Sequence, residues 1–75
     1  MKNEFAVLLV PTISHALKAE RLLKKGGYSC KLIPVPRHLS SDCGVCVRVG
    51  IVDRDLAQGI LEQGGMEASE WYDIP

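Results

Sequence analysis

The sequence lacks an excess of charge of either sign, because its nine basic and nine acidic residues cancel. This balance gives no electrostatic reason to expect nucleic acid or an anionic membrane as a partner. Long hydrophobic runs are also missing: the longest, residues 5–10, is far too short to cross a bilayer. The first residues lack the apolar region and cleavage site of a signal peptide. We therefore expect a cytoplasmic protein.

Several catalytic signatures are absent as well. The sequence contains no P-loop, no dinucleotide-binding fingerprint, no paired carboxylates and no Ser-His-Asp set. We therefore expect a carrier rather than an enzyme that turns over a substrate alone. Three cysteines cannot all pair within one chain, and in a reducing compartment such thiols are buried, metal-bound or reactive. A zinc site needs four ligands, and His15 and His38 are unsuitably spaced to complete one, so we predict no metal site.

What is present indicates one small domain, residues 1–75, of the α+β class. Strands are expected at 5–10, 28–34, 45–49 and 66–74, and helices at 15–25 and from Asp53 to about Gln63. The second helix should bury a stripe formed by Leu56, Ala57, Ile60 and Leu61. Residues 22–27 resemble residues 60–65, which suggests one helix–Gly–Gly unit used twice. The order βαββαβ predicts a ferredoxin-like sandwich, with two helices on one face of a four-stranded antiparallel sheet.

The stretch 39–48 is the candidate site. Ser40 and Ser41 precede the pair Cys43-Gly44, and a β-branched run follows, as expected for a loop that presents a thiol and enters a strand. The topology brings this loop to the sheet end where the first helix begins. Backbone N–H groups at a helix start stabilise an anion. The site therefore favours a Cys43 thiolate.

Other residues around this thiol have a predicted functional role, and for some of them a purely structural role is the alternative. Arg37, His38 and Arg48 add positive charge, and Gly44 lets the backbone turn sharply. The Ser40 and Ser41 hydroxyls can donate to a bound anion or simply to the local backbone. Together with Ser14 at the helix start, His15 completes the candidate set: it can transfer a proton, or it can be a surface or capping residue.

The other two cysteines differ in their predicted roles. Cys30 alternates with Leu32 on an inward face and should be a packing residue. Cys46 is either a thiol that resolves a species on Cys43 or an ordinary strand residue on the open face of the sheet. If Cys46 is in extended strand, the Cα atoms of Cys43 and Cys46 lie about 10 Å apart, beyond the reach of a disulfide unless the chain curls back at Gly44.

Two pieces of the sequence resemble the small selenium/sulfur (Se/S) carrier-like proteins: Pro-x-Pro-Arg at 34–37 and Leu-Ser-Ser-x-Cys-Gly at 39–44. Residues 12–20 are similar to that family's first helix start. The resemblance implies that Cys43 carries selenium or sulfur covalently, as a perselenide or persulfide, without another cofactor. It implies a donor such as a cysteine desulfurase or selenocysteine lyase, and an acceptor such as selenophosphate synthetase. The choice between selenium and sulfur stays open.

Two alternatives remain at the level of the sequence. Cys43 and Cys46 match Cys-x-x-Cys and could form a thiol-redox module. The chain could instead be a non-enzymatic ferredoxin-like interaction or ligand-binding domain. Open strand edges are compatible with a homodimer without requiring one.

Overall fold

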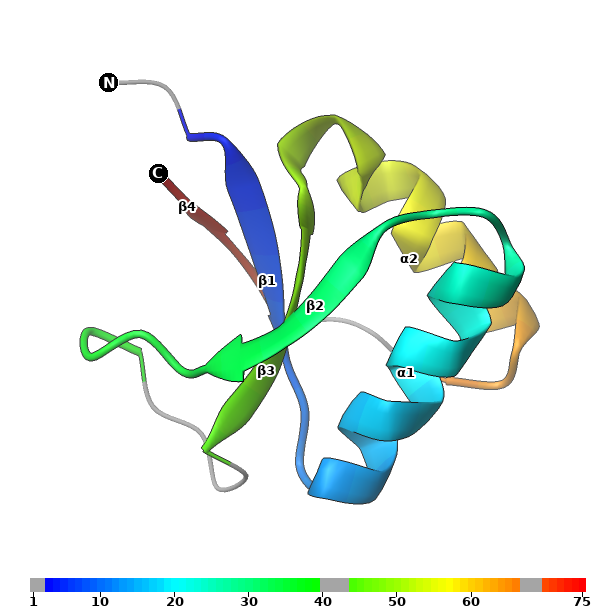
Figure 1. The fold of residues 1–75 in the computed structure, drawn as a ribbon, viewed down its shortest axis with the longest axis horizontal. Helices are drawn as coiled ribbons and strands as arrows, with labels where there is room; N and C mark the ends of the chain where they lie inside the picture. The colour runs from blue at the N-terminus through cyan, green and yellow to red at the C-terminus, as the bar shows by residue number, and fades with distance from the viewer. Residues whose placement is uncertain (1–2, 40–43, 67–69) are drawn as a thin grey trace.

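The computed structural model describes residues 3–39, 44–66 and 70–75 of the chain. The elements are β1 (Phe5–Leu9), α1 (Ile13–Lys25), β2 (Cys30–Pro34), β3 (Val45–Gly50), a short 3₁₀ helix η1 (Ile51–Asp53), α2 (Arg54–Gln63) and β4 (Trp71–Ile74). The strands pair antiparallel in the order β2-β3-β1-β4. Both helices lie on one face of this sheet (Figure 1). The predicted ferredoxin-like α+β fold is therefore confirmed.

Strand β1 lies in the middle of the sheet, between β3 and β4. Its residues Ala6 to Leu9 are buried whichever face of the sheet they point to, which explains the continuous apolar run in the sequence. Strand β2 lies at the edge of the sheet and ends at Pro34. An edge position suits Pro34, since proline cannot donate a hydrogen bond to a neighbouring strand.

In each Gly-Gly pair the first and the second glycine have different structural roles. A Cβ atom on Gly26 would lie 2.8 Å from Cδ1 of Ile60, and one on Gly64 would lie 2.5 Å from Cδ1 of Leu22. The first glycine of each pair thus lets the end of one helix approach the other helix. The second glycine, Gly27 or Gly65, has a φ of +88° or +82°, which an L side chain adopts only under strain. The sequence repeat therefore corresponds to reciprocal packing of α1 and α2.

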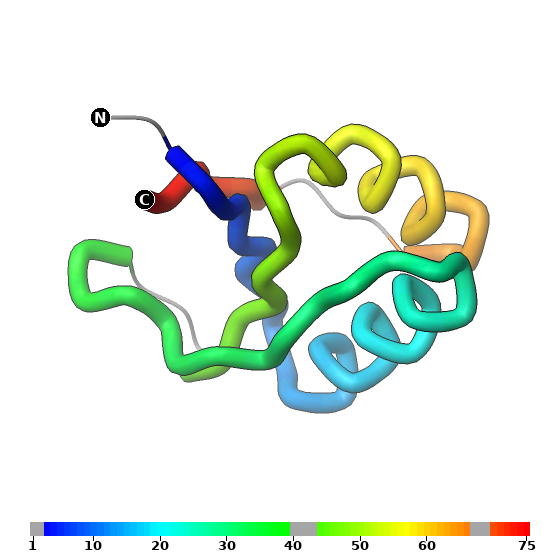
Figure 2. Tube along the Cα trace, turned by 45° about the horizontal axis from the view of Figure 1, so that its top comes forward, coloured from blue at the N-terminus to red at the C-terminus, as the bar shows by residue number. Residues whose placement is uncertain are grey.

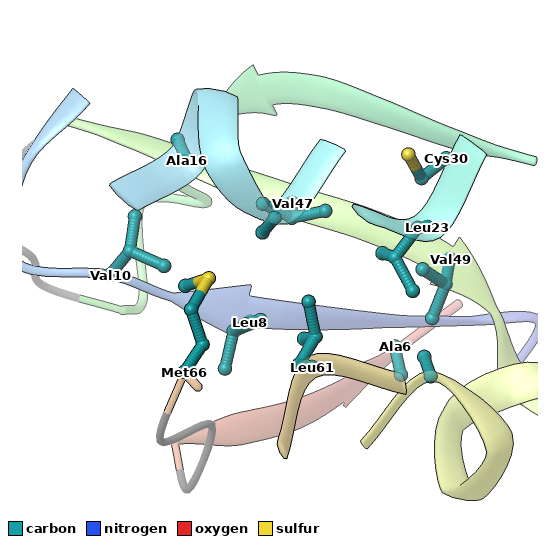
Figure 3. Packing of buried hydrophobic residues seen from close by; sticks show 12 residues of the cluster. Ala6, Leu8, Val10, Ala16, Leu23, Cys30, Val47, Val49, Leu61 and Met66 are labelled. Atoms are coloured by element: carbon teal, nitrogen blue, oxygen red, sulfur yellow. The ribbon is translucent and has the colours of Figure 1, made fainter. Parts of the chain in front are cut away.

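The main core lies between the sheet and the helices, and we call it the helix-side core. Twelve of the described residues are buried in it: Ala6, Leu8, Val10, Ala16, Ala19, Leu23, Cys30, Val47, Val49, Ala57, Leu61 and Met66. Figure 3 shows the side chains of Leu8, Val47 and Leu61 directed into the space between the layers.

Two predicted details were wrong. Leu56 is 54% exposed, because Ala57 and Leu61, one turn apart, form the buried face of α2 and Leu56 lies outside it. Strand β4 begins at Trp71 rather than at residue 66. Met66 instead ends the turn after α2, where its N–H donates to the carbonyl of Leu61 and its side chain enters the helix-side core.

A second, smaller cluster lies on the other side of the sheet, which we call the far face. Val7, Leu9 and Cys46 are buried there, and Ile33, Val35, Leu39 and Ile74 pack against them. Val35 and Leu39 belong to residues 35–39, the covering segment, which leaves β2 on the side away from the helices (Figures 1 and 2). The described chain therefore forms three layers: helices, sheet and covering segment.

Candidate functional site

Gly44 is the described residue nearest to the predicted carrier thiol. Cys43, Ser40 and Ser41 lie outside the described residues. Gly44 is exposed and has a φ of +74°, and an added Cβ would meet no atom within 4 Å. Its carbonyl accepts a hydrogen bond from the N–H of Val35 at 3.2 Å. The backbone therefore turns at Gly44, as the sequence predicted, and enters β3 against the end of β2.

The start of α1 lies at the same end of the sheet as Gly44. In the β1–β3 ladder Leu9 faces Cys46, so β1 ends where β3 begins, and α1 starts four residues later at Ile13. The turn at Gly65 also reaches this end, because α2 runs back toward it. We call it the Gly44 end of the sheet. The predicted meeting of the β2–β3 connection and the start of α1 is confirmed at the level of the backbone, and the turn at Gly65 joins them.

A groove of about 490 Å³ lies beside the start of α1. Its lining residues are Pro11, Ser14, His15, Lys18, Gly65 and Met66. Thr12, the N-cap of α1, accepts a hydrogen bond from the N–H of His15 at 3.2 Å. The Thr12 hydroxyl also lies 2.7 Å from Nδ1 of His15. Thr12 therefore fixes the His15 ring, and in the described part of the chain no hydrogen bond involves the other ring nitrogen, Nε2.

The charges at this helix start favour an anion. The first turn of α1 contains no acidic residue, so no carboxylate of that turn offsets the partial positive charge of its N–H groups. Lys18 adds a formal positive charge to the groove. Ser14 and His15 were predicted from the sequence as site residues, whereas Thr12 and Lys18 were not. The three-residue spacing between Thr12 and His15 is the signal that the N-cap could also hold the imidazole.

Arg37 and His38 lie away from this groove. Leu39 donates a hydrogen bond to the carbonyl of Pro36 at 2.9 Å, and this turn leaves Arg37 and His38 exposed. The turn belongs to the covering segment on the far face, whereas α1 lies on the opposite face (Figure 1). The structure therefore does not bring these two residues together with Ser14 and His15.

The Arg48 side chain also does not lie near the start of β3, where the sequence predicted its charge. Its guanidinium carbon lies 4.2 Å from the centre of the Phe5 ring. Phe5 faces Gly50 at the opposite end of the β1–β3 ladder from Leu9 and Cys46. We call this the Phe5 end of the sheet. The structure thus places the Arg48 charge toward the Phe5 end and not beside Gly44.

Cys46 and Cys30 are both buried, on opposite faces of the sheet. Cys46 is 0% exposed within the far-face cluster, and its Sγ lies 4.0 Å from the carbonyl oxygen of Pro34. Cys30 is 8% exposed in the helix-side core, and its thiol donates to the carbonyl of Glu20 at 3.8 Å. Burial raises the pKa of the Cys30 thiol, and the Glu20 carboxylate raises it further. The prediction that Cys30 is a packing residue is confirmed.

Two classes of feature are missing from residues 3–39, 44–66 and 70–75. No group of three His, Cys, Asp or Glu side chains is placed to hold a metal ion. No helix in these ranges has the length and hydrophobicity that a membrane span requires.

Comparison with known proteins identifies the family. The profile of the family described as "Putative Se/S carrier protein-like" matches residues 5–73. This match covers nearly the whole chain and every described strand and helix except the last residue of β4, Ile74. The chain therefore belongs to this Se/S carrier-like family, as the resemblance predicted. No curated protein and no solved structure matched the chain.

Proposed function

We propose that this chain carries selenium or sulfur on Cys43, as a perselenide or persulfide, from a donor enzyme to an acceptor enzyme. Membership of the Se/S carrier-like family is the observation that carries the proposal, because the matched range includes the Cys43-Gly44 pair. The donor would be a cysteine desulfurase or a selenocysteine lyase. The acceptor would be selenophosphate synthetase or another enzyme that uses the same atom. We place the reaction in the cytoplasm, where thiols stay reduced.

Loading would be a thiolate exchange. The Cys43 thiolate attacks the outer sulfur of a donor persulfide, a new S–S bond forms, the donor's S–S bond breaks, and the donor leaves as a thiolate. A perselenide on the donor is handled in the same way through an S–Se bond. Delivery repeats the exchange: an acceptor nucleophile attacks the outer atom and the Cys43 thiolate is regenerated. Neither step needs an external oxidant or reductant.

The surroundings of Gly44 support this chemistry. One peptide bond joins Gly44 to Cys43, and Gly44 is exposed at the sheet end where α1 begins. A persulfide or perselenide anion there would be favoured by the free N–H groups of α1 and by Lys18 in the neighbouring groove. His15, held by Thr12, would be the proton donor or acceptor at Nε2. Ser14, Ser40 and Ser41 would donate hydrogen bonds to the bound anion.

Cys46 has a smaller part in the proposal. Attack by Cys46 on Cys43 would release selenide or sulfide and leave a disulfide, but the Cys46 side chain is fully buried beside the covering segment. A buried thiol is a poor nucleophile until it is exposed and ionised. Transfer to an acceptor nucleophile is therefore the favoured route, and resolution by Cys46 would require the far-face cluster to open.

The test loads the purified chain and locates the carried atom. The wild type and the variants Cys43→Ser, Cys46→Ala and Cys30→Ala are exposed to a persulfide donor, and in parallel to selenite with excess thiol. Intact mass and peptide mapping then read the added atom. We expect a gain of one sulfur or selenium at Cys43 in all chains except Cys43→Ser. Equal loading of Cys43→Ser would refute the carrier proposal, and loading that also requires Cys46 would support the dithiol redox module instead.

A further inference from the structure

A second groove, of about 530 Å³, lies at the Phe5 end of the sheet, where β2 begins and β3 ends. Its lining residues are Phe5, Lys24, Gly27, Tyr28, Ser29, Cys30, Lys31, Arg48, Val49, Gly50 and Asp53. A hollow of this size is within the range of small-molecule sites. It lies at the opposite end of the sheet from Gly44, so it is separate from the proposed carrier site.

Two positive charges face each other in this groove. In the antiparallel β2–β3 ladder Lys31 is directly opposite Arg48, so both side chains leave the same face, with Cβ atoms about 5 Å apart. Like charges in such a pair destabilise a sheet. In the described ranges the ion pairs are Lys24 with Glu20 and Arg54 with Asp73, and neither includes Lys31 or Arg48. An anion bound between the two side chains would remove this repulsion.

Arg48 is already held in position for such a ligand. Its guanidinium lies over the Phe5 ring, with the carbon 4.2 Å from the ring centre, and the residue is half-buried. The N–H donors of a guanidinium lie in its own plane, and in the described ranges no ion pair engages those of Arg48. Because the side chain is fixed before binding, less conformational entropy is lost when it binds an oxyanion.

We infer that Lys31 and Arg48 form a binding site for a small-molecule oxyanion, a carboxylate or a phosphate group, attached to an apolar body. Phe5 and Tyr28 would contact that body. Among the described lining residues Asp53, near Gly50, is the one carboxylate, and it would repel a ligand with a second negative group. The expected ligand is therefore compact and carries one anionic group.

The test uses benzoate and phenyl phosphate, which share an apolar ring and differ in their oxyanion. Each is titrated into ¹⁵N-labelled protein at constant ionic strength, and amide chemical shifts are followed. We expect saturable shifts at residues 29–31 and 48–50. The probe with the lower dissociation constant tells whether the site prefers a carboxylate or a phosphate.

Two charge-reversal variants make the test specific. Lys31→Glu should weaken binding of the preferred probe about tenfold, because it replaces a charged donor by a repelling carboxylate. It should fold well, since Glu opposite Arg48 is a favourable cross-strand pair. Arg21→Glu makes the same charge change on the exposed surface of α1, outside the groove, and should leave affinity unchanged. Equal affinities of the two variants, or no saturable shift with either probe, would overturn the inference without affecting the carrier proposal.

Discussion

The two faces of the sheet are covered in different ways. The helix-side face is covered by α1 and α2 and shares a core of twelve buried residues with them. On the far face three of the described residues are buried, Val7, Leu9 and Cys46, and its cover includes Val35 and Leu39 from a segment without helix or strand. A helix is fixed to the sheet along several turns, whereas the described attachment of the covering segment consists of the Val35 and Leu39 side chains and the hydrogen bond from Val35 to Gly44. The far face should therefore open at a lower free energy than the helix-side face.

The far face is also divided along its length. Near the Gly44 end, Leu9, Cys46 and Ile33 are apolar and lie in one cluster with the covering segment. Toward the Phe5 end, the same face presents Arg48 and Lys31. Covering an apolar surface removes it from water and is favourable, whereas charged side chains are more stable when they stay hydrated. The position of the covering segment thus follows from the sequence of β2 and β3.

The largest expected effect is the loss of stability when a leucine is truncated in the helix-side core, compared with the same change in the far-face cluster. Leu23→Ala leaves a cavity in the helix-side core and should lower the free energy of unfolding by about 4 kcal/mol, most of the stability of a domain this small. Leu9→Ala on the far face should cost about 2.5 kcal/mol, because the covering segment can relax into the space. Urea unfolding followed by circular dichroism measures both.

The same substitution on the surface is the control for this pair. Leu17 is 47% exposed on α1, and Leu17→Ala should change the free energy of unfolding by less than about 0.5 kcal/mol. If Leu9→Ala costs as much as Leu23→Ala, the far face is as rigidly packed as the helix-side core, and the difference between the faces is refuted.

The second prediction concerns access to the two buried cysteines. Leu39→Ala removes one contact of the covering segment and should cost about 1.4 kcal/mol, which corresponds to tenfold more frequent local opening. The alkylation rate of Cys46 in reduced protein should therefore rise about tenfold, while that of Cys30 stays the same. Pulsed alkylation with peptide mass spectrometry gives both rates. An equal rise at Cys30 would mean that the whole domain, and not the covering segment, has been loosened.

The third prediction compares two glycines at which an added Cβ meets nothing within 4 Å. Gly44 has a φ of +74°, so Gly44→Ala should destabilise the fold by about 1 kcal/mol through backbone strain alone. Gly59 is inside α2, where alanine is the better helix former, so Gly59→Ala should stabilise the fold by up to about 1 kcal/mol. Thermal unfolding of both variants shows the two signs, and the same sign for both would contradict the backbone conformations described.

Most of the fold was predictable because local patterns agreed with the final architecture. The apolar run 5–10 gave the central strand, Pro34 gave the end of the edge strand, and the repeated Gly-Gly pairs gave the two helix ends. The burial of Leu56 was predicted wrongly, because hydrophobic periodicity locates the edge of the buried face of a helix only to within about one residue. Which side of that stripe is buried depends on how α2 is rotated on the sheet.

The candidate site was less predictable, because side-chain direction depends on contacts between distant residues. The topology correctly brought Gly44 and the start of α1 to one end of the sheet. The charge of Arg48 was assigned to that end from its closeness in sequence to Cys43, but stacking on Phe5 directs it to the other end. Likewise, no sequence pattern showed that Val35 and Leu39 would pack on the far face and leave Arg37 exposed there.

The smallest expected effect is a pH dependence carried by Cys30 in the helix-side core. Burial, and then Glu20, raise the pKa of its thiol above the ordinary value of 9.0, although Lys24 partly opposes this. Above pH 9.0 the unfolded chain loses the thiol proton while the folded chain keeps it, so stability is full below that pH and falls as the pH rises through the folded pKa. The variant Cys30→Ala lacks this dependence. Urea midpoints at increasing pH give the stability difference between the wild type and Cys30→Ala. This difference should narrow above pH 9.0. A constant difference would mean that the thiol ionises equally in the folded and the unfolded chain.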